Sequence, residues 1–518
     1  MKRLLGQSLT TSSAIFLSRV SGLVRDILFT SLFGVSALGD AFNYAYRIPN
    51  LLRLLFGEGA LSAAFIPVYS KVEQKHGKSY QLSFATNLLF YLAFFLFFTT
   101  LFAIVFAPYI VAMVAPGLTD GVRQITTQLT RVMLPYMLLI GISSILISVL
   151  NYHNYFFLPF LSSAMLNIGI LLCVFIYTKF LFLDIEGQLF AFSWGVVVGG
   201  VLQLVLLAVL MFRVGYRISL PQKGAKTYLK RVWQRFIPGV VGIGIRQINI
   251  YVDLLLASFL TVGSASALTY SYRLMQLALG LFGVPIWSVS LPSFSKLVAK
   301  QKFSHLEKAV KDALILSAYV MLPITAFIVI LAKDYIRVLF FRGAFGDTAL
   351  SMTNIALIFY ALGLVFYCFN HILVAVFYAF GNTKTPVKIS AIIAVINLVL
   401  NLILMRYLAH GGLALATFIS SVVYSLLLFI CIHKSFVQIK LLSIFFTLGK
   451  LLVSVLATAT ILYFSYGASY ANTFWTSLLR LFVFGVGGVI LYLLFNISLK
   501  TKYSHKILGP LWKKSTKN

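Results

Sequence analysis

The sequence is poor in charge, in acidic residues and in cysteine. Only 10% of its 518 residues are charged and only 12 are Asp or Glu, whereas about 25% of the residues of soluble domains are charged. This scarcity excludes an ordinary soluble enzyme, and the sequence has no HExxH, Walker or DxD motif for a metal or a nucleotide. The three cysteines, Cys173, Cys368 and Cys431, fall in separate apolar stretches, so neither a disulfide framework nor a cysteine metal site is expected.

Apolar residues fill most of the chain instead. They make up 60% of the sequence, the mean hydropathy is +0.96, and apolar runs recur at about the 20 residues that one membrane crossing requires. We predict an all-α polytopic membrane protein whose first helix is retained rather than cleaved as a signal peptide. The fourteen expected helices span residues 9–34, 38–71, 80–114, 123–150, 158–180, 187–212, 232–260, 264–297, 307–332, 347–378, 385–406, 411–433, 442–466 and 472–498.

The formal net charge of +30 arises largely from basic residues in alternate loops. They cluster at 71–78, 213–235 and 296–311, and in the tail from Lys500 to Lys517. This is the positive-inside pattern of a membrane protein rather than a surface for nucleic acid. With an even number of helices, it places both termini in the cytoplasm.

Charged residues also occur inside the first two predicted spans. A charge at that depth costs a few kcal/mol unless it faces protein or a watery cavity. Because arginines outnumber acids, we expect a polar cavity that attracts an anion. In the alternative interpretation, the arginines pair with acids such as Glu58 and Asp253 and hold helices together. The charged residues of these two spans are Arg19, Arg25, Asp26, Asp40, Arg47 and Arg53.

An internal repeat relates the two halves of the chain. Residues 41–47, AFNYAYR, match residues 267–273, ALTYSYR. Upstream of these motifs, Arg246 and Asp253 occupy the places that Arg19 and Asp26 hold in the first copy. Shared Arg and Asp are rarely coincidental between two apolar helices, so we infer a duplication.

The duplication predicts the architecture. Its two copies lie six predicted helices apart and therefore enter the membrane from the same side, as in transporters that bind substrate between parallel lobes. We predict six-helix lobes at 1–220 and 221–437, around a central cavity. An additional helix pair and a basic cytoplasmic tail follow at 438–518.

Helical geometry orients the charges of the first helix. Arg19 and Arg25 lie on different faces of a straight helix, and we expect a bend at Ser21-Gly22 to bring both to the cavity. Arg25 and Asp26 are adjacent and diverge, so Asp26 is expected to pair with another helix.

Arginine is the side chain that best suits a diphosphate, because its planar fork donates two hydrogen bonds and stays charged on burial. Pro49 is expected to kink the second helix beside Asn50 and Arg53, and Arg273 shares a helix face with Gln276. The residues expected to contact substrate are Arg19, Arg25, Asn50, Arg53, Arg273 and Gln276, and the supporting charge pairs involve Asp26, Arg47 and Arg246.

A second set of polar residues provides hard oxygen ligands for a cation. Asp253 supplies a carboxylate, Asn397 and Asn401 supply amides one helical turn apart, and Thr417 supplies a hydroxyl. These residues form a candidate Na⁺ site. The alternative is hydrogen bonding between helices, the ordinary use of Asn and Thr in membranes.

Several segments together resemble the MurJ (MviN) family of lipid II flippases. They are SRVSGLVRD at 18–26, GDAF at 39–42, RIPNLLRLLFGEGALSAAFIPVYS at 47–70, YRLMQLALGLFGVPIWSVSLPSFSK at 272–296 and TKTPVKI at 383–389. The resemblance runs from residue 1 through the twelfth predicted helix and includes two further C-terminal helices.

The resemblance implies a member of the multidrug/oligosaccharidyl-lipid/polysaccharide exporter superfamily in the bacterial inner membrane. Its substrate would be lipid II, a disaccharide-pentapeptide on undecaprenyl diphosphate. In that family the arginines matching Arg19, Arg25, Arg53 and Arg273 are essential cavity residues, as is the acid matching Asp40. The resemblance therefore adds Asp40 to the residues expected to contact substrate. Some members bind Na⁺ at positions resembling Asp253, Asn397, Asn401 and Thr417. Gln276 stands where some members have Glu, and Asn401 where the ion-binding pattern can have Asp.

We therefore predict a flippase, not an enzyme, that moves lipid II from the cytoplasmic to the periplasmic leaflet by alternating access. We expect a monomer whose partners are this substrate and membrane lipids, without nucleic acid and without a cofactor other than the candidate Na⁺. The alternatives are a flippase for another polyprenyl-diphosphate glycan and a multidrug antiporter of the same superfamily. An integral-membrane glycosyltransferase would need a catalytic carboxylate, and the loops offer only Asp120, Asp184, Glu186, Asp334 and Asp347.

Overall fold

The computed structural model describes residues 2–57, 60–155, 157–181, 184–213, 215–216, 226–438, 441–466, 473–499 and 501. Within these ranges the regular structure is helical and no strand occurs. Contacts divide the chain into two compact units, Met1–Ala265 and Ser266–Asn518. The first contains α1 (Lys2–Phe33), α2 (Ala37–Gly57), α3 (Ala60–Val105), α4 (Ala107–Val114), α5 (Asp120–Met133), α6 (Tyr136–Tyr152), α7 (Phe157–Ile176), η1 (Tyr177–Leu181), α8 (Ile185–Arg213) and α9 (Lys226–Ala257).

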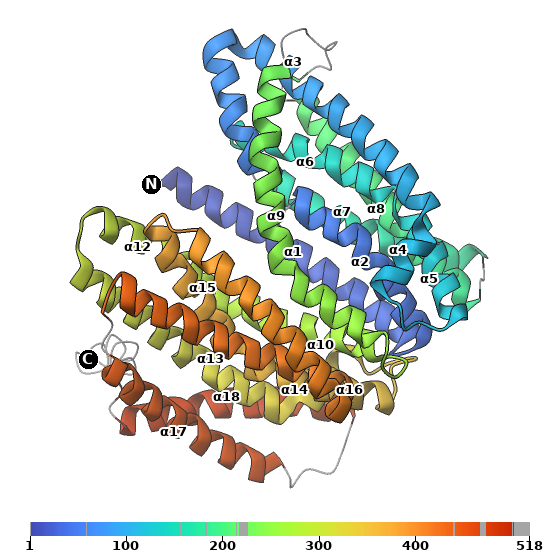
Figure 1. Cartoon of the computed structure of the whole chain (residues 1–518). Helices are drawn as coiled ribbons and strands as arrows, with labels where there is room; N and C mark the ends of the chain where they lie inside the picture. Colours follow the sequence, from blue (N-terminus) through green and yellow to red (C-terminus); the bar gives the residue numbers. More distant parts are fainter. Residues whose placement is uncertain are drawn as a thin grey trace, which may run out of the picture. The chain divides into compact units, whose positions relative to one another are not determined.

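The second unit begins within the first turn of α10 (Ser264–Ala278). Its remaining elements are η2 (Leu279–Gly283), α11 (Val284–Ser288), α12 (Ser290–Ala299), α13 (Phe303–Phe340), α14 (Asp347–Leu362), α15 (Leu364–Ala379), α16 (Lys384–Ser435), α17 (Leu441–Tyr466) and α18 (Phe474–Ser498). The long α13 packs against α14, α15, α17 and α18, and the red α17 and α18 run beside it in Figure 1.

The all-α membrane fold is confirmed, but the count of fourteen crossings is not. Nine helices of the described chain are long and apolar enough to cross a membrane, or ten if the bent pair α14–α15 is one span. The helices α1, α2 and α9 are not among them. They hold the intramembrane charges, which lower their hydropathy.

Several predicted boundaries differ from the observed ones. The predicted helix 38–71 is divided between α2 and α3. By contrast, the predicted division between helices 385–406 and 411–433 agrees with the break inside α16 at Ala409, whose φ is 48°. Pro49 and Ser21-Gly22 lie within α2 and α1, which continue past them.

Asp334 was predicted in a loop, but it lies inside α13 and is fully buried. The prediction ended the helix at residue 332 because Lys333 and Asp334 interrupt the apolar pattern. The structure provides Asp334 with buried polar partners on α18, Ser477 and Arg480, which is why the helix can continue through a charge.

The packing of α9 differs from the predicted lobes. The sequence repeat places the boundary at residue 220, whereas α9 packs against α3 within the first compact unit. The boundary at residue 220 reflects the sequence duplication, whereas the boundary after Ala265 reflects spatial contacts. The division into six-helix lobes stays a prediction.

Glycines allow α7 and α8 to approach closely. Gly195 and Gly199 are four residues apart on α8 and face Ile170 and Leu166 of α7. A β-carbon on Gly199 would lie 2.6 Å from the carbonyl oxygen of Leu166. Small residues at this spacing are a common device for joining helices in a membrane, where van der Waals contact replaces the hydrophobic effect.

We expect Gly199→Ala to destabilise the protein by about 1–3 kcal/mol, because the new methyl group would force two backbones apart. Gly487→Ala in α18 is the matched control, since a β-carbon there has no atom within 4 Å. Thermal unfolding of the detergent-solubilised chain measures both. Equal melting temperatures for the two variants would contradict close packing of α7 and α8.

Candidate functional site

Arg25 is the centre of a hydrogen-bonded network between α1 and α7. Its Nη1 donates to Asn167 Oδ1 at 2.9 Å, and its Nε and Nη2 donate to Asp26 Oδ1 at 3.1 and 2.8 Å. The Asn167 amide in turn donates to Ser21 Oγ at 2.9 Å. This arrangement orients the guanidinium and leaves it half-buried.

The expectation that Arg25 and Asp26 diverge was wrong. Their carboxylate and guanidinium form an ion pair at 2.8 Å. Neighbouring β-carbons do point apart on a helix, but the long arginine side chain can fold back along the helix surface. The divergence of neighbouring β-carbons therefore keeps short side chains apart but does not separate Arg25 from Asp26.

Arg19 lies apart from this network. It is exposed on α1, and it makes no hydrogen bond or ion pair with a described residue. The helix α1 continues through Ser21-Gly22, and the expected bend there stays a prediction.

Arg53 and Asn50 are joined on α2, as their spacing suggested. Arg53 Nε donates to Asn50 Oδ1 at 3.0 Å, and both side chains are half-buried. Tyr136, at the start of α6, interacts electrostatically with both Arg53 and Arg25. Tyr46 of α2 interacts electrostatically with Arg25. The first unit thus gathers two arginines of α1 and α2 around two tyrosines.

We call Arg25, Tyr46, Arg53, Tyr136 and Asn167 the arginine cluster. Sequence reasoning did not predict its tyrosines or its asparagine. Tyr136 is 1% exposed, and its hydroxyl has no hydrogen-bond partner among the described residues. Asn167 is a lone amide in an apolar helix, which was the available signal. Buried polar groups normally have partners, so the cluster has capacity for an additional polar group.

Asp40 is held by a backbone N–H group. Its Oδ2 accepts a 2.6 Å hydrogen bond from the backbone N–H of Gly263, and its side chain is buried. Gly263 has a φ of +91°, and a β-carbon there would lie 2.4 Å from Val35 Cγ1. These contacts favour a role for Asp40 in fixing the chain before α10.

We expect Asp40→Asn to keep most of the thermal stability, because the amide oxygen can accept the same hydrogen bond. Asp40→Ala should cost about 1–3 kcal/mol, since it leaves the buried N–H of Gly263 without an acceptor. Thermal unfolding in detergent compares the two. A stable alanine variant would show that this hydrogen bond contributes little.

Arg47 is positioned by α9. Its guanidinium carbon lies 5.4 Å from the ring centre of Tyr251, and the Tyr251 hydroxyl donates to the carbonyl of Arg47 at 3.3 Å. This contact joins α2 to α9 within the first unit, which suits the predicted supporting role. The side chain of Arg246 and the whole of Glu58 lie outside the described residues.

Arg273 and Gln276 lie on α10 in the second unit. Arg273 is half-buried and Gln276 is exposed. The Gln276 amide donates to the Tyr272 hydroxyl at 2.8 Å, and the Tyr272 ring packs edge-on against Tyr360.

The candidate Na⁺ residues of α16 make hydrogen bonds within their own helix. Asn401 donates to Asn397 Oδ1 at 3.1 Å within α16, and Thr417 Oγ1 donates to the carbonyl of Leu413 at 3.1 Å. Both asparagines are buried, and Asp253 is 7% exposed. The Asn397 oxygen accepts this hydrogen bond with one lone pair and keeps the other for a cation. In the described part of the chain, no three His, Cys, Asp or Glu side chains group as metal ligands.

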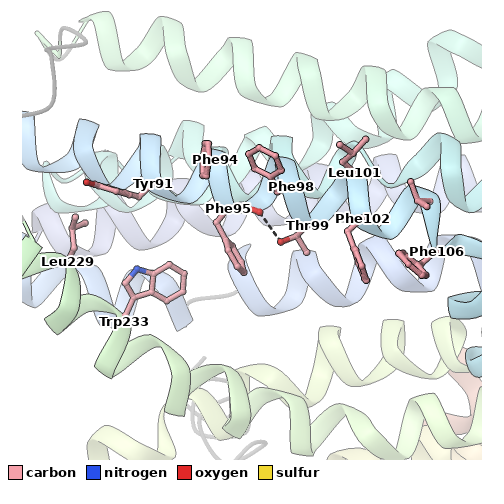
Figure 2. A pocket seen from close by; sticks show the side chains of 11 residues that line it. Tyr91, Phe94, Phe95, Phe98, Thr99, Leu101, Phe102, Phe106, Leu229 and Trp233 are labelled. Atoms are coloured by element: carbon pink, nitrogen blue, oxygen red, sulfur yellow. Dashed lines mark hydrogen bonds between the residues drawn. The ribbon is translucent and has the colours of Figure 1, made fainter.

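An apolar groove of about 1010 Å³ lies on α3 and α9. Figure 2 shows its aromatic wall, with Trp233 and Leu229 contributed by α9. The hydroxyl of Thr99, the threonine in its lining, donates to the carbonyl of Phe95 at 2.8 Å. Because no charged residue lines it, this groove is not an anion site.

Comparisons with known proteins agree along nearly the whole chain. The family model described as "Lipid II flippase MurJ" matches residues 29–485. A protein of Buchnera aphidicola subsp. Baizongia pistaciae, named a probable lipid II flippase MurJ, is 31% identical over 519 residues and covers 96% of this chain and 97% of its own. Its namesake from Buchnera aphidicola subsp. Acyrthosiphon pisum is 32% identical and covers 83% of each chain.

Solved structures show the same fold. A structure entitled "Lipid II flippase MurJ, inward closed conformation" matches with a TM-score of 0.80 and 26% identity, over 97% of this chain and 99% of that one. An inward-facing multidrug transporter of the MATE family matches with a TM-score of 0.68 over 82% and 96% of the two chains, but its 15% identity indicates the fold alone. The chain therefore belongs to the lipid II flippase MurJ family and is a multi-pass transporter of the bacterial inner membrane, not an enzyme.

Proposed function

We propose that this protein translocates lipid II from the cytoplasmic to the periplasmic leaflet by alternating access. The relatives named above support the substrate. The observation that carries the chemistry is the arginine cluster, in which Arg25 and Arg53 both interact with the buried Tyr136. Two guanidinium groups in a membrane-embedded helical unit can donate hydrogen bonds to an anion with several oxygens, and a diphosphate is such an anion.

In the proposed cycle, Arg19, Arg25, Arg53 and Arg273 contact the diphosphate during transport, with Asn50, Asp40 and Gln276 as further candidate contacts. Each guanidinium can donate two parallel hydrogen bonds to phosphate oxygens. The sugar-peptide head group would occupy a hydrated cavity, and the prenyl chain would remain in lipid. Opening to the periplasm would then release the head group.

The return of the empty carrier requires a source of energy. Moving one elementary charge through the membrane potential is worth about 2.3 kcal/mol per 100 mV, so a net positive cavity makes the potential a suitable source. Na⁺ binding by Asp253, Asn397, Asn401 and Thr417 is the second candidate. Asp253→Asn should then remove any Na⁺ dependence of transport while leaving its voltage dependence.

The proposed topology has both termini in the cytoplasm and a monomeric carrier, with lobes at 1–220 and 221–437 and the added pair at 438–518. The basic loops support this orientation, because Lys and Arg remain on the cytoplasmic side. Cysteine labelling from either side of the membrane tests it at Lys75 and Asp120, which are exposed.

Depletion of the protein in cells without a redundant flippase tests the function. Lipid II is expected to accumulate on the cytoplasmic leaflet, because such cells have no other protein to carry the diphosphate head group across the hydrocarbon core of the membrane. Normal lipid II translocation would refute the proposed substrate. Accumulation of another polyprenyl-diphosphate glycan in its place would identify a flippase with a different head group.

A further inference from the structure

A second buried charge cluster lies in the second unit, where α13 ends and α18 begins. Its charged members are Asp334 and Arg337 of α13 and Arg480 of α18. Asp334 is 0% exposed, and each arginine is 8% exposed. The half-buried Tyr466, the last residue of α17, interacts electrostatically with all three. Neither the repeat nor the proposed transport cycle uses these residues.

The carboxylate of this cluster is engaged by α18. Arg480 Nη1 lies 3.6 Å from Asp334 Oδ1, and Ser477 Oγ donates to the same oxygen at 2.5 Å. The Arg480 guanidinium also lies 5.4 Å from the ring centre of Tyr466. Asp334 and Arg480 thus form one neutral pair that joins α13 to the C-terminal helices.

Arg337 is the positive charge that this pair does not neutralise. Its guanidinium lies 5.2 Å from the ring centre of Phe341, and it makes no hydrogen bond or ion pair with a described residue. Its Nε is buried without a hydrogen-bond acceptor. Arginine stays protonated even when buried, and a buried N–H of a charged group without an acceptor costs free energy. An anionic acceptor would remove this penalty.

The position of Arg337 indicates where that acceptor comes from. Arg337 is three residues before the end of α13, and Arg480 is six residues after the start of α18. At 1.5 Å per residue, these side chains are about 5 and 9 Å from the helix ends. Long basic side chains at this depth extend to the interface, where the phosphates of lipid head groups lie.

We propose that Arg337, with Arg480 beside it, binds the phosphate group of a membrane lipid at the junction of α13, α17 and α18. The planar fork of Arg337 donates two hydrogen bonds to phosphate oxygens, and Arg480 remains paired with Asp334. The lipid thereby links the C-terminal helix pair to α13. Phosphatidylglycerol and undecaprenyl phosphate present the same group and are distinguished by experiment.

The test uses the purified full-length chain in dodecyl maltoside, a detergent without phosphate. Phosphatidylglycerol, undecaprenyl phosphate, inorganic phosphate and diacylglycerol are added separately, and thermal unfolding and lipid retention in native mass spectrometry are measured. The variants are Arg337→Gln and Arg337→Lys. Arg342→Gln is the matched control, because Arg342 is exposed and lies just beyond the same helix.

We expect a phosphate-bearing lipid to raise the melting temperature of the wild type and of Arg342→Gln, and diacylglycerol to leave it unchanged. Arg337→Gln should lose the shift and the retained lipid, and Arg337→Lys should retain part of both. Without added lipid, Arg337→Gln should be at least as stable as the wild type, because it removes a charge that the protein does not pair.

Three results would overturn the proposal. They are an equal lipid-induced shift in Arg337→Gln, a lower stability of that variant without lipid, and a shift produced by inorganic phosphate as large as that of the lipids. A larger shift with undecaprenyl phosphate than with phosphatidylglycerol supports the site and assigns it to a prenyl lipid; the reverse order assigns it to bulk phospholipid.

Discussion

Arg25→Ala is expected to abolish transport and to destabilise the protein. The alanine removes the guanidinium that donates twice to Asp26 Oδ1 and once to Asn167. Removing one partner of a buried ion pair costs about 3–5 kcal/mol, and the proposed diphosphate contact is lost as well. Complementation of a depleted strain measures transport, and thermal unfolding of the purified variant measures stability.

The double variant Arg25→Ala/Asp26→Asn separates these two effects. It removes both charges, so most of the stability lost by Arg25→Ala should return. Transport should remain absent, because neither the alanine at position 25 nor the asparagine at position 26 carries the positive charge that would bind a diphosphate. Recovery of transport together with stability would show that Arg25 serves only to pair with Asp26.

Arg53→Ala is expected to abolish transport with little loss of stability. Arg53 Nε donates to Asn50, a half-buried neighbour on the same helix, and each hydrogen bond of this kind contributes about 0.5–1.5 kcal/mol. Arg53→Lys keeps the charge but loses the two-pronged geometry, so it should transport partially. The measurements are the same complementation and unfolding assays.

Arg131→Ala is the control for charge alone, since Arg131 is an exposed arginine of the first unit. It should complement like the wild type. If Arg53→Ala also complements fully, the arginine cluster has a structural rather than a substrate-binding role.

The sequence predicts the fold class well because membrane helices depend on composition. Apolar runs locate segments such as α8 and α18 to within a few residues. Helix breaks depend instead on local backbone geometry, such as the positive φ of Gly77 within α3 and of Ala409 within α16. The gaps predicted between residues 71 and 80 and between residues 406 and 411 contain these two breaks, and the count of fourteen helices remains a prediction.

Sequence reasoning placed Arg53 one helical turn beyond Asn50 without predicting the hydrogen bond between them, and the substrate contacts of both residues stay predictions. It failed where side-chain length or a distant helix decides. The fold-back of Arg25 onto Asp26 overrides the divergence of neighbouring positions. The burial of Asp334 depends on Ser477 and Arg480, which are more than one hundred residues away in the sequence.

The most direct test of the central claim is transport of lipid II by the purified chain in vesicles. Movement between leaflets is followed by the accessibility of the head group to an external enzyme. The wild type and Arg131→Ala should move lipid II, whereas Arg53→Ala should leave it on its original leaflet, with all three proteins present in equal, folded amounts. Equal movement by Arg53→Ala and the wild type, or none by the wild type, would contradict an arginine-dependent lipid II flippase.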